Sequence, residues 1–297
     1  MIKCTTMTEE FSNSYNRYRI FEELITGEDA TINIARVALL IATIEYSNFD
    51  IEHYLAKLDE LAHRVRTVLS LIPMTMPEDI APLTIIDAIN KVLFEEEQFH
   101  GNEDDYYNPD NSFFNKVLDT RVGIPISLSL LYIEIGKRVG LNVEGVSLPF
   151  HFVVRCVLPT EILYIDPFER GLLLNEQDCR ERIRLMSHGR MTRLPHHLFE
   201  PVKPRQLLVR MLGNLKNIYL HKEDYTRSLL VSEYLLLLIP DAAREVRDRG
   251  IIHLQLKHYA RALHDLKTYL KLEPQASDRH EIQNHIKATQ QIISMMN

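Results

Sequence analysis

The chain of 297 residues has no tryptophan, three cysteines and only ten glycines. The cysteines are Cys4, Cys156 and Cys179, an odd number without CxxC spacing. Such a set defines neither a disulfide framework nor a zinc site. The few glycines form neither a phosphate-binding loop nor a dinucleotide fingerprint. We therefore expect no bound cofactor.

Long apolar runs are also missing. The longest in the C-terminal half covers residues 234–239, far short of the roughly 20 residues that a bilayer requires. The first residues do not combine a basic region with an apolar run, so they predict no secretory signal. A net charge of −7 disfavours nucleic acid as the main partner, because counterion release needs clustered Lys and Arg. We expect a cytoplasmic protein that binds neither membrane nor nucleic acid, and the sequence leaves its oligomeric state open.

What the chain does contain, between about residues 15 and 95, is helical periodicity. Apolar residues recur at helical spacing from Ile34 and again from Ile51, with Asp50 as the predicted N-cap of the second helix. Residues 72–77 predict a turn or linker. Pro82 predicts the start of the next helix, since proline suits the first turn.

The middle of the chain, about 95–200, predicts an α+β core. Residues 126–139 are apolar on almost all sides, which is typical of a helix at the centre of a domain, and Gly140 is its predicted C-cap. The strand-like runs 143–148, 150–155 and 163–166 follow, rich in β-branched and aromatic residues. A buried helix followed by a small antiparallel sheet is an α+β arrangement.

An internal repeat with a period of 34 residues occupies the last hundred positions. Equivalent pairs are Tyr225 and Tyr259, Ser228 and Ala262, and Pro240 and Pro274. A small residue three positions after an aromatic one, with proline closing each unit, is typical of tetratricopeptide repeats. We predict two such repeats and a capping helix over 280–296, with domains at 1–200 and 201–297. The repeats offer a concave surface to a protein or peptide partner.

The run from Tyr106 to Tyr132 resembles the core motif of the bacterial SirB-type family, as do the segments 143–146, 149–152 and 165–168. Residues 245–250 and the repeats around them are also similar to that family. The resemblance covers roughly residues 20–290. It implies a transglutaminase-like, papain-like domain followed by tetratricopeptide repeats, which is an architecture rather than an activity.

A site of this kind needs a cysteine at a helix N-terminus, where the helix dipole stabilises the thiolate. It also needs a histidine as base and an Asp or Asn that orients the histidine. The resemblance places the histidine at His151 and the carboxylate at Asp166. Where related enzymes carry the cysteine, the best match is Pro125, which carries no chemistry. The resemblance therefore implies a degenerate domain without its nucleophile.

Other nucleophiles are conceivable at Ser127, Ser129, Cys156 and Cys179. Ser127 lies two residues beyond Pro125, which rotates it about 200° around the helix axis, and a serine hydroxyl needs stronger activation than a thiol. Cys156 follows His151 by five residues, an odd separation that places it on the opposite face of a strand. Cys179 falls in a polar segment after the sheet. We interpret both cysteines as inert thiols rather than relocated nucleophiles.

A polar group before the central helix supplies candidate binding residues: Asn111, Asn115, Asp119, Arg121 and Ser127. The alternative is a structural role, in which Arg121 pairs with Asp119 or Glu144. His151 is similarly either a buried partner of Asp166 or part of a ligand pocket.

Metal ligands were sought among neighbouring histidines and acids. His100, Glu103, Asp104 and Asp105 share one loop, where clustered acids are usually solvated. His196 and His197 are adjacent, so they lack the i, i+4 spacing of a zincin helix. We predict no metal site.

These observations favour a non-catalytic protein- or peptide-binding regulatory protein. The rival hypothesis is an enzyme of altered chemistry that acts on amide or peptide substrates through His151 and Asp166. A regulator that touches DNA is disfavoured by the acidic charge. An open cleft beside His151 with converging donors would favour the enzyme, and a cleft filled by Tyr or Phe would favour the binding protein.

Overall fold

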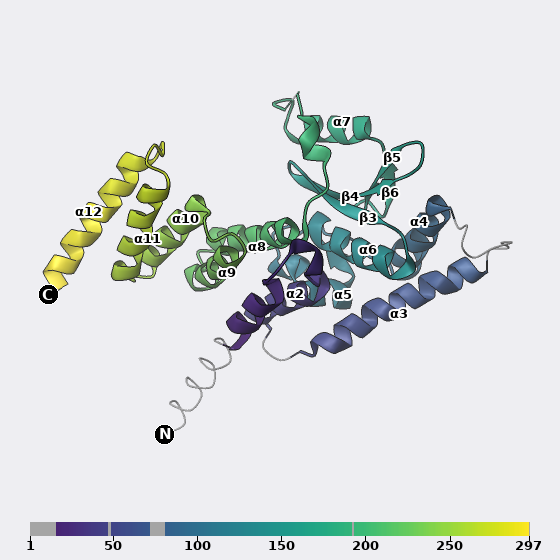
Figure 1. Cartoon of the computed structure of the whole chain (residues 1–297), viewed down its shortest axis with the longest axis horizontal. Coiled ribbons are helices and arrows are strands. Elements are labelled where there is room, and N and C mark those ends of the chain that lie inside the picture. The colour runs from purple at the N-terminus through teal and green to yellow at the C-terminus, as the bar shows by residue number, and fades with distance from the viewer. Residues whose placement is uncertain (1–15, 47–48, 72–80, 192, 297) are drawn as a thin grey trace, which may run out of the picture. The chain divides into compact units, whose positions relative to one another are not determined.

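The computed structural model describes residues 16–46, 49–71, 81–191 and 193–296, and it divides into two compact units (Figure 1). One unit is Thr26–Met211. The other is built from both ends of the chain, Met1–Ile25 and Leu212–Asn297. Cys4 and the expected turn at 72–77 lie outside the described residues.

Five α-helices of the unit 26–211 precede its main sheet. They are α2 (Ile34–Ile41), α3 (Ile51–Ser70), α4 (Pro82–Asn90), α5 (Phe114–Thr120) and α6 (Pro125–Val139). Three predicted helix signals are confirmed. The Asp50 carboxylate caps α3 by accepting the backbone N–H of Glu52 at 2.9 Å, Pro82 is the first residue of α4, and Gly140 ends α6 with φ +82°.

Four antiparallel strands in the order β3-β4-β5-β6 form the main sheet. They are β3 (Val143–Leu148), β4 (His151–Val157), β5 (Ile162–Asp166) and β6 (Leu172–Leu174). The first three match the predicted runs closely, and β6 was not predicted. Two residues each from β1 (His100–Gly101) and β2 (Val122–Gly123) also pair, in parallel, just before α6.

The central helix α6 packs between other helices and the sheet. Its neighbours are α3 and α4 on one side and β3 and β4 on the other, which the ribbon shows (Figure 1). Every residue of α6 from Pro125 to Gly136 is buried. The prediction of a helix apolar on nearly all sides at the centre of an α+β domain is confirmed.

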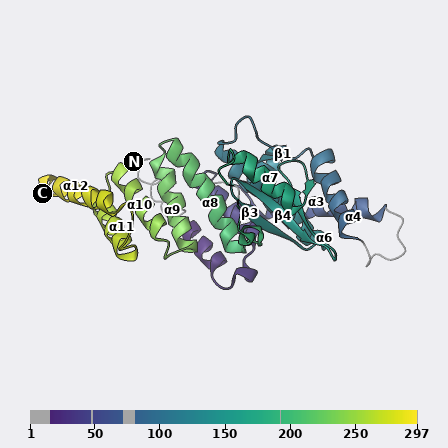
Figure 2. The ribbon, with the colours of Figure 1, turned by 90° about the horizontal axis from the view of Figure 1, so that it is seen from above.

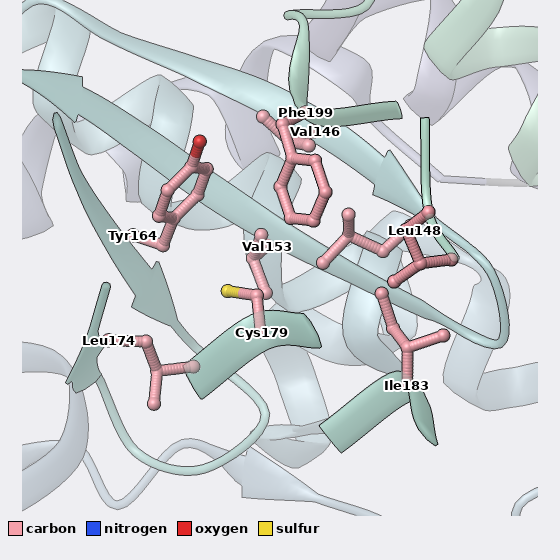
Figure 3. Packing of buried hydrophobic residues seen from close by; sticks show 9 residues of the cluster. Val146, Leu148, Val153, Tyr164, Leu174, Cys179, Ile183 and Phe199 are labelled. Atoms are coloured by element: carbon pink, nitrogen blue, oxygen red, sulfur yellow. The ribbon is translucent and has the colours of Figure 1, made fainter. Parts of the chain in front are cut away.

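The opposite face of the sheet is covered by α7 (Glu176–Met186) and the short helix η6 (His196–Phe199). Strand residues such as Val146, Val153 and Tyr164 meet Cys179 and Ile183 of α7 in one apolar cluster (Figure 3). The charged helix α7 buries one apolar face on the sheet, because Cys179 and Ile183, four positions apart, lie on the same side of the helix.

Both repeats are present in the C-terminal part of the chain, as predicted. The helices are α8 (Pro204–His221), α9 (Tyr225–Leu238), α10 (Ala243–Gln255), α11 (Tyr259–Leu272) and α12 (Arg279–Met296), and Figure 2 shows α9 to α12 in succession. Ser228 and Ala262 are fully buried. A Cβ added to Gly250 would lie 2.9 Å from the Leu266 side chain, so α10 and α11 approach closely at this point.

A further helix at 16–25 belongs to the same unit as the repeats. The Phe21 side chain is fully buried, and its ring centroid lies 4.6 Å from that of Tyr234 in an edge-to-face arrangement. Tyr18 also approaches Tyr234, at 6.1 Å between centroids. The first described helix of the chain thus completes the apolar packing of the first repeat.

Candidate functional site

His151 and Asp166 form a hydrogen-bonded pair at the ends of neighbouring strands. The imidazole Nε2 lies 2.7 Å from the carboxylate Oδ2 of Asp166. The Asp166 side chain is fully buried, while 11% of the His151 side chain is exposed. The predicted contact between these two residues is confirmed, and it fixes the orientation of the imidazole ring.

The Asp166 carboxylate has several further partners. Its Oδ1 accepts the backbone N–H of Phe168 at 3.1 Å, and Arg182 of α7 lies 3.5 Å from its Oδ2. A buried carboxylate is costly unless it is paired and hydrogen-bonded. The Phe168 amide, His151 and Arg182 together meet that requirement. The position of the His151–Asp166 pair is therefore stable with or without a catalytic role.

Strand register decides which face of the sheet the pair occupies. His151 lies opposite Leu148, and Val153 opposite Val146, on the face that α7 covers. Gly145, on the other face, lies below Ile133 of α6. Pro125 does begin α6, as expected. That Pro125 faces the pair stays a prediction.

One aromatic ring, that of Phe168, lies next to His151. The Phe168 ring stands edge-to-face to the imidazole at 6.1 Å between centroids, and Tyr106 follows at 6.5 Å from Phe168. Phe168 also covers Gly101, where an added Cβ would come within 2.4 Å of the ring. Gly101 is therefore needed as glycine for this close approach.

The two described cysteines are buried and lack the properties of reactive thiols. Cys156 lies on the face of β4 opposite His151, as predicted from the odd spacing. Burial raises the pKa of its thiol. Burial, reinforced by the negative charge of Asp166, raises the pKa of the Cys179 thiol to about 12. Since the thiolate is the nucleophilic form, both sulfur atoms are protonated near neutral pH.

The serine hydroxyls of α6 are engaged in structural hydrogen bonds. Ser127 Oγ donates to the carbonyl of Asn111 at 2.7 Å and accepts the N–H of Ile124 at 3.1 Å, which caps the helix start. Ser129 Oγ donates to the carbonyl of Phe152 at 3.4 Å. Both side chains are fully buried. These contacts explain the two serines as anchors of α6.

The polar residues that were predicted to bind a ligand lie in different parts of the structure. Asn111 is buried and donates to the carbonyl of Asp105 at 2.7 Å, so it shapes the loop before η5 (Pro109–Ser112). Asp119 accepts hydrogen bonds from Tyr54 at 2.7 Å and Lys57 at 2.6 Å. Burial opposes ionisation of Asp119, but these two bonds outweigh it and lower its pKa. The set thus divides between a loop and a helix surface.

Asn115 is buried, whereas Arg121 is exposed at the end of α5. Asn115 is 3% exposed, and its Oδ1 has no hydrogen-bond partner among the described residues. Arg121 does not pair with Asp119 or Glu144, and that expectation is wrong. Its guanidinium bonds Glu97 at 2.6 Å, while Glu144 pairs with Arg155. The reason is that Arg121 ends α5 with φ +64° and turns towards Glu97, which ends the π-helix Lys91–Glu96.

Neither group of proposed metal ligands is assembled in the structure. His100 Nδ1 lies 2.9 Å from the carbonyl of Gln98. Across the described ranges, no three His, Cys, Asp or Glu side chains are placed to hold a metal ion. Within those same ranges, none of the helices combines the length and apolar character that crossing a membrane requires.

Two neighbours of the pair were not found from the sequence, Arg182 and Phe168. Arg182 lies 16 residues after Asp166 in a different element, so its contact with Asp166 depends on how α7 packs on the sheet. Phe168 lay within the segment 165–168 that carried the resemblance, so that motif was the available signal.

Comparison with known proteins agrees with this geometry. The transglutaminase-like superfamily matches residues 52–213, and a tetratricopeptide repeat family matches residues 215–287. A UPF0162 protein of Xylella fastidiosa strain Temecula1 is 35% identical over 272 residues, which are 90% of this chain and 93% of that protein. A UPF0162 protein of Vibrio cholerae is 30% identical over 188 residues, 62% of this chain and 68% of its own.

A similarity to a mammalian protein covers less of the chain. Human F-box only protein 21 is 35% identical over 142 residues, which are 45% of this chain and 22% of that protein. The two bacterial relatives and the superfamily match agree with the SirB-type resemblance. The chain belongs to the UPF0162 family, and it joins a transglutaminase-like domain to tetratricopeptide repeats.

Proposed function

We propose that the chain is a cytoplasmic, non-catalytic regulatory protein that binds a protein or peptide partner through its helical repeats. The observation that carries this proposal is that α6 begins with Pro125, where a thiolate would otherwise gain from the helix dipole. The buried, protonated thiols of Cys156 and Cys179 give the same argument further support. The ring of Phe168 beside His151 is what we expect of a filled cleft.

The activity test offers the full chain an amine donor and a glutamine-containing peptide, with and without iodoacetamide. We expect no incorporation in either case, because an acyl-enzyme needs a nucleophile that the site lacks. A positive control with a thiol-dependent transglutaminase shows that the assay works. Turnover that alkylation abolishes would show that a cysteine reaches the site, and the proposal would be wrong.

The binding test uses the lysines as reporters. Lys267 and Lys271 lie on the repeat helix α11, whereas Lys116 and Lys137 lie on α5 and α6 of the other unit. The full chain is used to capture its partner from an extract of the source cell, and the complex is then treated with an amine cross-linker. We expect the cross-links to join the partner to Lys267 and Lys271. Cross-links confined to Lys116 and Lys137 would place the partner on the transglutaminase-like unit instead.

The second candidate function is an enzyme of altered chemistry on amide or peptide substrates. It is favoured by the 2.7 Å bond between His151 and Asp166, which is the arrangement of a histidine base and its orienting carboxylate. Positioned base catalysis contributes about 10²–10⁴-fold. Thiol-independent turnover that is lost in His151→Ala would establish this alternative.

A further inference from the structure

A pocket of about 650 Å³ lies where α4 and its continuation meet the turn between β5 and β6. Its polar lining consists of Asp87, Asn90, Lys91, Glu95, Gln98 and Arg170. Its volume lies within the range of small-molecule sites. None of these side chains takes part in the His151–Asp166 pair.

The backbone around this pocket is irregular in three places. Lys91–Glu96 forms a π-helix that continues α4, and such segments occur frequently at functional sites. Gln98 and Arg170 adopt φ values of +61° and +53°, a region that favours glycine. Strained residues of this kind cluster at ligand sites, where surrounding structure holds them in place. Both strained residues line the same pocket.

Asn90 joins α4 to the β5–β6 turn at one wall of the pocket. Its Nδ2 donates to the carbonyl of Gly171 at 3.0 Å. Its Oδ1 is buried against Gly171, where an added Cβ would lie 2.3 Å from it. Asn90 therefore holds this wall of the pocket in place.

Charged side chains of both signs line the pocket without forming ion pairs among the described residues. Asp87 and Glu95 are acidic, and Lys91 and Arg170 are basic. Among the described residues, none of the four forms an ion pair, whereas Arg64, Arg121 and Arg138 on the same unit all do. An anion site or a cation site would concentrate one sign, but this pocket presents two charges of each.

We propose that this pocket binds a small zwitterion of the α-amino-acid class. The ligand's ammonium group is placed by the Asp87 and Glu95 carboxylates. Its carboxylate is bound by Lys91 and Arg170, and the remaining volume holds its side chain. The site is independent of the partner surface proposed above, so either proposal stands if the other fails.

The first test measures binding to the full chain by calorimetry with the twenty free amino acids as probes. Concentrations up to about 10 mM fill even a site of millimolar Kd. For the amino acid that binds best, we expect the N-acetyl and the carboxamide derivatives each to bind about tenfold more weakly or worse, because each removes one charge-assisted contact. Equal binding of either derivative, or no binding by any amino acid, would overturn the proposal.

The second test changes the pocket itself. Arg170→Gly removes the guanidinium and also suits the positive φ, so the variant is expected to fold at least as well as the wild type. Glu95→Gln removes one carboxylate with little change of shape. Each variant should bind the amino acid about tenfold more weakly, whereas Lys137→Gln, an exposed change on α6, should bind as the wild type does. Unchanged binding in both pocket variants would refute the assignment.

Discussion

At the scale of single residues, Phe150 combines a bulky side chain with a backbone that favours glycine. It lies in the two-residue turn between β3 and β4 with φ +64°, and 55% of it is exposed. A left-handed conformation costs roughly 1–2 kcal/mol for a residue with a Cβ. The exposed ring returns little of this free energy, since it is largely in contact with water.

We therefore expect Phe150→Gly to raise the free energy of unfolding by about 0.5–1 kcal/mol, after the greater freedom of glycine in the unfolded chain is subtracted. Urea unfolding measures the change. Phe150→Ala keeps the strain and serves as the control, which should not be stabilised. A destabilised glycine variant would show that the ring makes a contact worth more than the strain.

The thiols give a second prediction at this scale. With a pKa of about 12, the thiolate fraction of Cys179 at pH 8 is about 10⁻⁴. In a Cys4→Ser background we expect the native protein to react negligibly with iodoacetamide within an hour, and both remaining thiols to react once the chain is unfolded. Mass spectrometry counts the modified cysteines. Rapid labelling of native Cys156 or Cys179 would contradict their burial.

The candidate site shows which residues a sequence motif can reveal. His151 and Asp166 were found because both fall within short motifs at strand ends. Arg182 was missed as their neighbour because its contact depends on how α7 packs on the sheet. The pairing of Arg121 was predicted wrongly, since the left-handed turn at the end of α5 that redirects it has no glycine to signal it.

At the scale of elements, the close approach of α10 and α11 depends on small residues. Ala262 is fully buried, whereas Ala260, two positions earlier on α11, is exposed. Ala262→Leu should overpack the helix pair and cost about 1–3 kcal/mol. Ala260→Leu is the matched control and should leave the melting temperature nearly unchanged. Equal melting of the two variants would contradict the proposed register of the repeats.

His253 makes the second repeat sensitive to acid. Burial, with help from Arg249 and His258 and against Asp265, lowers its pKa to about 4. The unfolded chain binds this proton near pH 6.5, so stability is fully present above that pH and is lost as the pH falls towards 4. The loss by pH 4.5 is about 2–3 kcal/mol.

The equivalent residue of the first repeat suggests a substitution that tests this effect. Tyr219, 34 residues before His253, is buried at the equivalent position. His253→Tyr should remove about 2 kcal/mol of the difference between urea unfolding at pH 7 and at pH 4.5. His264→Tyr changes an exposed histidine on α11 and should keep the wild-type difference. The same acid loss in both variants would assign it to other groups.

Elements were predicted well where periodicity or capping marked them. The repeats, α3, α6 and the first three strands of the sheet have such signals. Strand β6 has three residues and α5 has seven, lengths too short for either period to stand out. The helix α7 was missed because its buried face needs few apolar residues within a charged segment.

At the scale of the whole molecule, the repeat unit draws on both ends of the chain. Phe21 is fully buried against Tyr234. Phe21→Ala should therefore cost the repeat unit about 3–5 kcal/mol, and hydrogen exchange of the α9 amides should accelerate. Arg19→Ala, which removes an exposed pair with Glu23, is the control and should change exchange little. Unaltered α9 exchange in Phe21→Ala would show that helix 16–25 does not stabilise the repeats.

The position of Phe21 also sets an order of events during synthesis. Its ring partner Tyr234 is made more than two hundred residues later. At about 5–20 residues per second, Phe21 is made roughly 10–40 s before Tyr234. Throughout that interval the Phe21 ring is without its native partner, because residues 22–233 must be translated first. The length of the intervening chain therefore sets how long the helix 16–25 waits before it can pack on the repeats.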